Sequence, residues 1–471
     1  MKNVCTEETI AAISTPALGS GGISIIRISG RDAFTIADRL FKSPSGKKLA
    51  DMPTHTIHYG HIVQNRGEKA AVIDEVLVSV MRAPRTFTAE DNVEINCHGG
   101  MLVTGKILEE TLKAGARLAQ PGEFTKRAFL NGRIDLAQAE GVIDIINAQN
   151  DHSLKASVGQ LGGRLSREIE TMREGLLNHT AFMEAAMDDP EHISMEGHIS
   201  VLENDIDEYL LKTDNLLKGF NEGRLLKEGI STCILGRANA GKSSLLNLLT
   251  GTESAIVTDI AGTTRDTVKE SVRMGDIILN LTDTAGIRDT EDKVEAIGIK
   301  KAMEAASDAE LIILVADASK PLTDEDSGIY EIIKDKPCIV LLNKSDIGIN
   351  VSREDAAAVF ANKDNPPEII TFSATTAEGL TELENIIKKK FRLDEIMVND
   401  APVSVNVRHK ECLENAKKSL ILVKEGIRSG LSEDLVCVDM MDAYAALGLI
   451  LGVEIEDDLA DRIFESFCMG K

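Results

Sequence analysis

The chain contains 471 residues, enough for roughly two to four domains, and 43% of them are hydrophobic, so several packed cores can form. A net charge of −24 disfavours non-specific binding to nucleic acid, and the longest apolar stretch, Ala443–Val453, is too short to span a bilayer, which argues against stable membrane insertion. Seven cysteines without a C-x-x-C pair argue against a disulfide framework or a zinc site and favour the reducing cytoplasm.

Residues 1–133 show an α+β pattern without a phosphate-binding loop or metal-ligand spacing. We expect strands and helices in this region at the following positions: strands at Ile23–Ile28, His55–Val63, Glu75–Met81 and Val93–Cys97, and helices at Asp32–Phe41 and Leu102–Lys113. The region carries a small positive charge balance, whereas the rest of the chain carries the acidic excess. If RNA touches the protein, this region is therefore the better surface, or a basic partner carries the RNA.

Helical periodicity extends from about Leu136 to Lys227 and returns from about His409 to Phe467. Asp188-Asp189-Pro190 interrupts the first of these runs. Each flank offers helices with one apolar face, and those faces are buried best against each other. The sequence therefore predicts a discontinuous helical domain, residues 134–227 and 392–471, into which residues 228–391 are inserted.

Within the inserted region, the strand-like stretch Ile230–Leu235 leads into Gly-Arg-Ala-Asn-Ala-Gly-Lys-Ser at residues 236–243. This is the G-x-x-x-x-G-K-[ST] phosphate-binding loop, in which glycines allow backbone N–H groups to point at phosphates. Lys242 is expected to reach the β- and γ-phosphates, and Ser243 to offer its hydroxyl to Mg²⁺. Strand and helix patterns alternate over 228–391, which predicts a parallel sheet with helices on both faces and a ligand at the carboxyl ends of its strands.

Further motifs follow in the order typical of proteins that bind guanine nucleotides. Gly262–Asp266 occupies the place of a first switch, in which Thr264 is a second candidate ligand of Mg²⁺. Asp283–Gly286 resembles a second switch, and the carboxylate of Asp346 in Asn343–Asp346 can accept the N1–H and the amine of guanine. These motifs predict binding and hydrolysis of GTP. The residues expected to contact GTP are Asn239, Ala240, Gly241, Lys242, Ser243, Ser244, Thr258, Asp259, Ile260, Ala261, Gly262, Thr263, Thr264, Asp283, Thr284, Ala285, Gly286, Asn343, Lys344, Asp346, Ser373, Ala374 and Thr375.

The catalytic candidates are Lys242, Asn239 and Glu295. Ile287 stands after the second-switch glycine, and its side chain cannot orient water as the usual glutamine does. The Asn239 side chain could hold a monovalent cation that does the work of an arginine finger, or Asn239 could be an ordinary turn residue. Glu295 could orient water through a relay, or could be a first-turn carboxylate favoured by the helix dipole.

A resemblance to a known family is carried mainly by motifs outside the GTP-binding region. These motifs are Gly21–Gly30, Phe87–Asp91 with Glu94, His98–Gly100, Pro121–Arg133 and the terminal Phe467–Lys471. Together with the first switch, they make the sequence similar over its whole length to the MnmE/TrmE family of GTPases that modify the wobble uridine of tRNA. The resemblance implies a multidomain α/β protein with an N-terminal folate-binding and dimerisation domain, a discontinuous helical-bundle domain and an inserted Ras-like P-loop GTPase domain.

The resemblance also implies ligands for particular residues. The residues that match the site for 5-formyl- or methylene-tetrahydrofolate are Arg27, Glu94, Arg133 and Lys471. Those that match the K⁺ site are Asn239, Thr258, Ile260 and Thr263, and the catalytic glutamate of the family falls on Glu295. Cys468 matches a near-terminal cysteine, which could be a nucleophile, a redox-sensitive thiol or a packing residue.

The family implied by these motifs forms homodimers and acts with a FAD-containing partner, MnmG or GidA, in a heterotetramer or larger assembly. Together they install an aminomethyl or carboxymethylaminomethyl group on carbon 5 of the wobble uridine. An RNA-binding GTPase of ribosome assembly is the alternative, but it would need an appended basic domain, and the C-terminal flank is helical and acidic. A membrane-linked GTPase would need a basic amphipathic helix or a lipidation site, and the sequence has neither.

Overall fold

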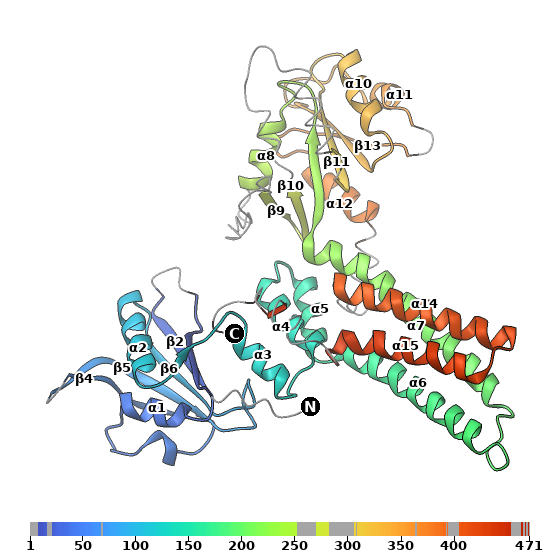
Figure 1. The fold of residues 1–471 in the computed structure, drawn as a ribbon. Helices are drawn as coiled ribbons and strands as arrows, with labels where there is room; N and C mark the ends of the chain where they lie inside the picture. Colours follow the sequence, from blue (N-terminus) through green and yellow to red (C-terminus); the bar gives the residue numbers. More distant parts are fainter. Residues whose placement is uncertain are drawn as a thin grey trace. The chain divides into compact units, whose positions relative to one another are not determined.

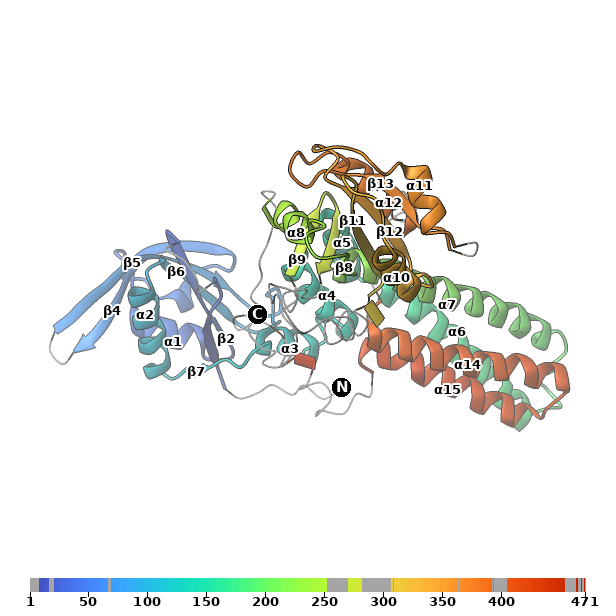
Figure 2. The same cartoon turned by 90° about the horizontal axis from the view of Figure 1, so that it is seen from above.

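The computed structural model describes most of the chain, as two compact units. The described residues are 8–16, 21–66, 69–251, 270–281, 306–307, 309–362, 365–391, 393, 405–453, 463–464, 467 and 470. One unit consists of Met1–Asn147, Ser157–Asp214 and Val407–Lys471, and the other of Ala148–Ala156 and Asn215–Asn406. Figures 1 and 2 show the helices and strands of both units.

The first unit contains a seven-stranded sheet with the strand order β3-β4-β5-β6-β2-β1-β7. Its strands are β1 Ile10–Ile13, β2 Ile23–Ser29, β3 Phe41–Lys42, β4 Thr56–Arg66, β5 Lys69–Met81, β6 Asn92–His98 and β7 Arg117–Leu118. The helices beside it are α1 Ala33–Leu40, α2 Met101–Lys113 and α3 Glu123–Leu130. Neighbouring residues Ile26, Ile95 and Val78 point to one face and are fully buried with Ile107 of α2. The expected α+β pattern is confirmed, and β1, β3, β7 and α3 are additions to it.

The same unit contains helices from both ends of the chain. They are α4 Leu136–Asn147, α6 Arg164–Asp188, the first part of α7 His198–Glu228, α14 Val407–Ser429 and α15 Glu433–Leu451, while α5 Asp151–Leu161 follows α4. Figures 1 and 2 show α6, α7, α14 and α15 side by side. The Arg173 guanidinium of α6 lies 4.1 Å from the ring centroid of Tyr444 in α15, and Lys417 of α14 lies 2.6 Å from Asp214 of α7. The helices of the two flanks therefore pack against each other, as predicted.

Buried ion pairs join the beginning of α14 to α4. The Nε and Nη2 atoms of Arg408 each lie 3.0 Å from a carboxylate oxygen of Glu140, and Nε2 of His409 lies 2.7 Å from Oε2 of the same residue. Burial alone would raise the pKa of Glu140, but the charge and hydrogen bond of His409, together with Arg408, outweigh it and lower the pKa to about 2. Arg408 also donates to the carbonyl oxygens of Leu449 and Ile450 at the end of α15. Glu140 therefore connects residues that are far apart in the sequence.

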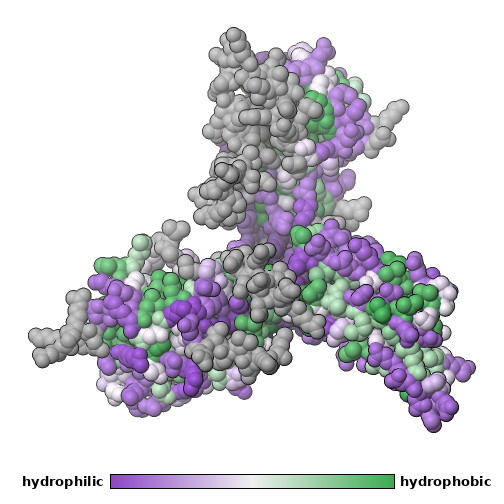
Figure 3. Space-filling model, in the orientation of Figure 1, coloured by the Kyte–Doolittle hydropathy of each residue, from purple (hydrophilic) through white to green (hydrophobic). Residues whose placement is uncertain are grey.

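The outer surface of the bundle is mixed in polarity. Leu422, Leu435 and Val438 are exposed on α14 and α15. Figure 3 shows apolar residues lying between polar ones over these helices. Among the described residues, no helix combines the length and the apolar character that crossing a membrane requires.

The second unit contains a six-stranded sheet with the order β13-β12-β11-β8-β10-β9. Its strands are β8 Ile230–Leu235, β9 Glu270–Met274, β10 Ile277–Leu281, β11 Leu311–Asp317, β12 Cys338–Asn343 and β13 Glu368–Thr371. Its helices are α8 Lys242–Gly251, α10 Asp324–Ile333, α11 Arg353–Val359 and α12 Leu380–Lys390. Leu245 of α8 and Leu383 of α12 belong to one core, while Tyr330 of α10 and Ala356 of α11 belong to a second core on the other face. Helices therefore cover both faces, as predicted.

The sheet departs from the predicted all-parallel arrangement at one edge. Strand β9 runs antiparallel to β10, with Met274 paired to Ile277, whereas β10, β8, β11, β12 and β13 are parallel. Only Gly275 and Asp276 separate the two paired residues, and Gly275 has a φ of 61°. A connection this short can close a hairpin but cannot cross over to a parallel strand.

The described cysteines are buried core thiols. Cys233 of β8 and Cys338 of β12 point into the same core. Burial raises the pKa of the Cys233 thiol to about 11 and that of Cys338 to about 12. These two side chains are therefore protonated at neutral pH and act as small apolar residues.

Candidate functional site

The predicted phosphate-binding loop connects β8 to the first residue of α8. Gly236 has a φ of 144°, and a Cβ there would lie 2.1 Å from the carbonyl oxygen of Val315. Gly241 has a φ of 105°, and a Cβ there would lie 2.0 Å from Nδ2 of Asn343. Both positions therefore require glycine, because a side chain would strain the backbone and collide with the neighbouring strand ends.

Lys242 folds back over this loop. Its Nζ atom donates to the carbonyl oxygens of Gly236 at 2.8 Å and Arg237 at 2.6 Å. Burial lowers the pKa of the Lys242 ammonium, and the nearby carboxylate of Glu325 opposes that shift. Ser243 and Ser244 follow in the first turn of α8 and are exposed. The N-terminus of a helix, with its free N–H groups, suits an anion.

The motif expected to recognise guanine is bonded directly to the phosphate-binding loop. Nδ2 of Asn343 donates to the carbonyl oxygen of Ala240 at 2.9 Å, and Nζ of Lys344 donates to that of Asn239 at 2.7 Å. The amide oxygen of Asn343 accepts from the N–H of Ala374 at 3.0 Å. The buried side chain of Asn343 therefore holds together three loops that are separate in the sequence.

Asp346 lies at the exposed end of the same loop. Its Oδ1 atom accepts from the hydroxyl of Ser373 at 2.7 Å, and that hydroxyl accepts from the N–H of Thr376 at 3.2 Å. The carboxylate is thereby fixed in orientation while Asp346 and Thr375 remain exposed. A fixed and exposed carboxylate next to backbone N–H groups can accept two adjacent donors from a purine base.

Asn239 occupies the turn of the phosphate-binding loop with a φ of 62°. Asparagine adopts this left-handed conformation more readily than other residues with a side chain. Its side chain is exposed, while its carbonyl oxygen is held by Lys344. The backbone of this residue is therefore fixed, and its amide is available to a ligand above the loop.

Asp317 is a residue of this site that the sequence analysis missed. It is the last residue of β11, opposite Asn343 in the parallel register. Its Oδ2 lies 2.7 Å from Nζ of Lys344, and its Oδ1 accepts from the N–H and the hydroxyl of Ser319 at 3.0 and 2.6 Å. Burial alone would raise the pKa of Asp317, but these bonds outweigh it and lower the pKa. A carboxylate at the end of an apolar strand was the available signal.

Several predicted site residues lie outside the described residues. They are Thr258, Asp259, Ile260, Ala261, Gly262, Thr263, Thr264, Asp283, Thr284, Ala285, Gly286, Glu295, Cys468 and Lys471. The two switches, the catalytic glutamate and most of the K⁺ ligands therefore stay predictions. Of the two candidate ligands of Mg²⁺, the structure describes Ser243.

Three of the four candidate folate residues come together in the first unit. Arg27 of β2 and Glu94 of β6 are directly paired across the sheet, with Nε of Arg27 2.9 Å from Oε1 of Glu94. The guanidinium carbons of Arg27 and Arg133 lie 5.6 and 5.3 Å from the ring centroid of Phe87. Nη1 of Arg133 donates to the carbonyl oxygen of Phe87 at 2.9 Å. Phe87 is therefore the shared contact of the two arginines. The sequence indicated it only as the first residue of the Phe87–Asp91 motif and not as a residue of the site.

The last described residue of the chain also reaches this cluster. The carbonyl oxygen of Gly470 accepts from the hydroxyl of Ser14 at 3.0 Å and from Nη1 of Arg27 at 3.4 Å. Gly470 has a φ of 92°, and a Cβ there would lie 2.3 Å from the carbonyl oxygen of Ile13. Gly470 is thus bonded to β2 through Arg27 and to Ser14, the residue that follows β1.

Two family profiles match the chain. One, described as the GTP-binding protein TrmE N-terminus, matches residues 9–133, and the other, described as the MnmE helical domain, matches residues 136–468. A tRNA modification GTPase MnmE from Lachnoclostridium phytofermentans is 50% identical over 465 residues, which cover 98% of this chain and 99% of the relative. A protein of the same description from Lactobacillus johnsonii is 47% identical over 472 residues, which cover 100% of both chains.

Solved structures of other GTP-binding proteins are similar to part of the chain. Era in complex with MgGDPNP and a segment of 16S ribosomal RNA is 30% identical, covers 34% of this chain and 56% of its own, and has a TM-score of 0.26. The G domain of the FeoB iron transporter of T. maritima is 25% identical, covers 35% of this chain and 98% of its own, and also has a TM-score of 0.26.

Proposed function

This chain belongs to the MnmE family of tRNA modification GTPases, and from that premise we propose that it uses K⁺-stimulated GTP hydrolysis to modify carbon 5 of the wobble uridine. As a member of this family it is a multidomain α/β protein that binds GTP with Mg²⁺ and hydrolyses it, and tRNA is the substrate of the modification. The proposed product carries an aminomethyl or carboxymethylaminomethyl group. The proposed one-carbon donor is 5-formyl- or methylene-tetrahydrofolate.

The bonds between the Asn343–Lys344 pair and the phosphate-binding loop carry this proposal. Asn343 and Lys344 hold the carbonyl oxygens of Ala240 and Asn239, so the site for the base and the site for the phosphates form one surface. In this arrangement Asp346 accepts the N1–H and the amine of guanine, and the hydroxyl of Ser373 keeps its carboxylate oriented.

The residues of the phosphate-binding loop suit a nucleotide with its metal ion. Lys242 now donates to two backbone carbonyls, and a phosphate oxygen can take the place of either. The exposed hydroxyl of Ser243 could hold Mg²⁺, which would neutralise phosphate charge. The amide of Asn239 would hold K⁺ beside the same phosphates, with Thr258, Ile260 and Thr263 as further ligands. Glu295 would then orient the attacking water.

The cluster around Phe87 suits the proposed folate donor, which supplies the one-carbon unit. Arg27 and Arg133 present guanidinium groups to the acidic tail of a folate, and Glu94 can accept from the N–H donors of its pterin. Lys471 follows Gly470, whose carbonyl oxygen contacts Arg27, which supports a further cation at this site. Cys468 is a further candidate functional residue, as a nucleophile, a redox-sensitive thiol or a packing residue.

We further propose that the chain works as a homodimer with the FAD-containing partner MnmG, in the cytoplasm. The acidic excess outside residues 1–133 suits a basic partner that carries the tRNA. We set aside the alternative of a ribosome-assembly GTPase, because the MnmE helical profile extends over residues 136–468 and α14 and α15 occupy the region where a basic RNA-binding domain would be needed.

The proposed role of K⁺ is tested by GTP hydrolysis in K⁺ and in Na⁺. We expect K⁺ to raise turnover by about 100-fold, in line with the effect of one group that stabilises transition-state charge. Asn239→Gly should lose this stimulation, because glycine keeps the left-handed backbone but removes the amide. Ala238→Gly in the same loop is the matched control and should keep it. Equal turnover of the native chain in the two salts would remove the cation from the mechanism.

A further inference from the structure

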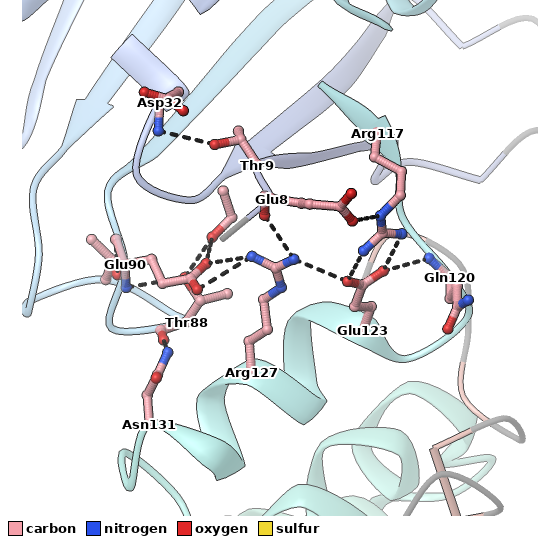
Figure 4. A network of polar contacts seen from close by, with 12 residues as sticks. Glu8, Thr9, Asp32, Thr88, Glu90, Arg117, Gln120, Glu123, Arg127 and Asn131 are labelled. Carbon is pink, nitrogen blue, oxygen red and sulfur yellow. Dashed lines mark hydrogen bonds and ion pairs between the residues drawn. The ribbon is translucent and has the colours of Figure 1, made fainter. Parts of the chain in front are cut away.

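Arg127 lies at the centre of a buried polar network in the first unit (Figure 4). It projects from α3 between Glu90 and Glu123, and only 2% of the residue is exposed. Nη1 lies 3.2 and 3.1 Å from the two carboxylate oxygens of Glu90. Nη2 lies 3.0 Å from Oε1 of Glu123 and 3.0 Å from the carbonyl oxygen of Glu8. One guanidinium therefore holds two buried carboxylates and the backbone of Glu8, which lies two residues before β1.

The Glu90 end of the network fixes the short segment Thr86–Glu90. Ser29 donates to Oε2 of Glu90 at 2.9 Å and shares a 2.7 Å hydrogen bond with Thr88. Thr86 donates to the carbonyl oxygen of Glu90 at 2.6 Å. Ala89 has a φ of 60°, a left-handed conformation that costs energy for alanine and persists only where the surroundings hold it.

The same segment is also held by the residues that follow α3. Nδ2 of Asn131 donates to the carbonyl oxygen of Thr88 at 2.8 Å, as Figure 4 shows, and Arg133 donates to that of Phe87. Phe87 thus lies between the buried residues Thr88 and Glu90 on one side and the two arginines that flank its ring on the other. The position of Phe87 therefore depends on Arg127 of α3 and on Asn131 and Arg133, which follow that helix.

We propose that Arg127 is a positioning residue for the folate site, acting through Glu90 and the Thr86–Glu90 segment on Phe87. This inference rests on the proposed function. Arg127 does not contact the ligand; it fixes the aromatic ring against which Arg27 and Arg133 are oriented. A small displacement of that ring would separate the two guanidinium groups that receive the acidic part of the ligand.

The forked shape of the guanidinium is the property that the site uses. Within the described residues, Nε of Arg127 has no hydrogen-bond partner, and all its bonds come from the two terminal nitrogens. A lysine would keep the positive charge between the two carboxylates, but its single nitrogen cannot reproduce the fork. Arg127→Lys therefore removes positioning with the least change in charge.

The first test measures binding of 5-formyltetrahydrofolate to the full chain by calorimetry. Arg127→Lys should weaken binding by about tenfold. Arg117→Lys is the matched control, because Arg117 belongs to the same network through Glu8 and Glu123 but makes no bond to the Thr86–Glu90 segment. It should change affinity by less than about twofold. Asn131→Ala, at a half-buried turn position, removes one hydrogen bond to the segment and should weaken binding by about threefold.

The second test measures the solvent accessibility of the aromatic side chain at position 87. The chain has no tryptophan, so Phe87→Trp introduces a single fluorescent reporter. Adding Arg127→Lys to Phe87→Trp should increase the quenching of this tryptophan by acrylamide, whereas adding Arg117→Lys should not. A merely stabilising Arg127 would change the unfolding midpoint but leave quenching of the folded protein unaltered.

The outcomes separate this inference from the proposed function. Weaker binding together with increased quenching for Arg127→Lys alone supports positioning. Binding and quenching equal to those of Arg117→Lys overturn it. If the native chain binds no folate while Arg127→Lys still increases quenching, the folate proposal fails and the inference is reduced to control of the ring. If Arg127→Lys does not fold, the Asn131→Ala variant tests the inference instead. Weaker binding of 5-formyltetrahydrofolate by that variant supports positioning of the segment, and unchanged binding contradicts it.

Discussion

The nucleotide edge of the six-stranded sheet and the network around Arg127 use charged residues in opposite ways. At the nucleotide edge, Lys242 bonds only backbone carbonyls in its described contacts, and the carboxylate of Asp346 is exposed. In the network, Arg127 and Glu90 neutralise each other in the interior. The first arrangement can exchange its partners for those of a ligand at small cost, whereas the second cannot, because each partner would leave a buried charge behind.

The difference indicates which charged residues can bind a ligand and which stabilise the fold. A lysine bonded to carbonyls gains by binding a phosphate, since a charged acceptor makes a stronger hydrogen bond than a neutral one. The carboxylate of Glu123, in contrast, already forms charged hydrogen bonds with Arg117 and Arg127. Burial alone would raise its pKa, but the hydrogen bonds from Arg117, the N–H of Gln120 and Arg127 outweigh it and lower the pKa. Glu140 behaves in the same way between α4 and α14.

The largest expected effect concerns the exposed carboxylate at the nucleotide edge. Asp346→Asn should shift the preference for GTP over xanthosine triphosphate by on the order of 10³-fold, because an amide donates where guanine also donates and pairs with the carbonyl of xanthine. Affinities for the two nucleotides, measured by fluorescence titration, give the ratio. Asp335→Asn, which removes an exposed charge from a turn of the same unit, is the control.

An unchanged preference for GTP in the Asp346→Asn variant would mean that the base is read elsewhere. This result would also contradict the comparison between the nucleotide edge and the Arg127 network, because the exposed carboxylate of Asp346 would then not bind a ligand. Equal shifts in both variants would show that only the overall charge matters.

The next effect concerns a buried pair. Glu140→Gln should lower the free energy of unfolding at pH 7 by ~3 kcal/mol, because Arg408 and His409 would lose a charged partner in the interior. Urea unfolding followed by circular dichroism measures the change. Glu203→Gln, at a surface pair with Arg428, should cost less than about 0.5 kcal/mol and serves as the control.

The pH dependence sharpens this prediction. The folded-state pKa of Glu140 is about 2, below its ordinary value of 4.5, so the stabilisation is complete above pH 4.5 and is lost as the pH falls towards 2. The native chain and Glu140→Gln should therefore differ most above pH 4.5 and converge near pH 2. A difference that stays constant over this range would mean that packing, rather than the charge of Glu140, is what the substitution changes.

The nucleotide edge could be predicted from sequence because its chemistry lies in short contiguous segments. The loop from Gly236 to Ser243 and the segment from Asn343 to Asp346 each carry their function in adjacent residues, and parallel strands bring their ends together. Asp317 was not predicted, because a single carboxylate at the end of a strand does not form a recognisable sequence motif. The antiparallel β9 was not predicted, because the alternation of strand and helix patterns over 228–391 indicates parallel strands joined by helices rather than a two-residue hairpin.

The Arg127 network could not be predicted in the same way. Glu8, Ser29, Glu90 and Arg127 are separated by many residues, and only the closure of the sheet and the packing of α3 bring them together. The family resemblance indicated Arg27 and Arg133 as site residues. That both of them contact Phe87 follows only from the geometry of the side chains. The domain boundaries, the switch residues and Glu295 stay predictions.

The measurement that tests the central claim most directly is mass analysis of wobble nucleosides in tRNA from cells that lack this chain. The account predicts that aminomethyl or carboxymethylaminomethyl uridines disappear, return with the native gene, and do not return with Lys242→Ala, which removes the ammonium from the phosphate-binding loop. An unchanged nucleoside profile in the deleted strain, or full restoration by Lys242→Ala, would contradict it.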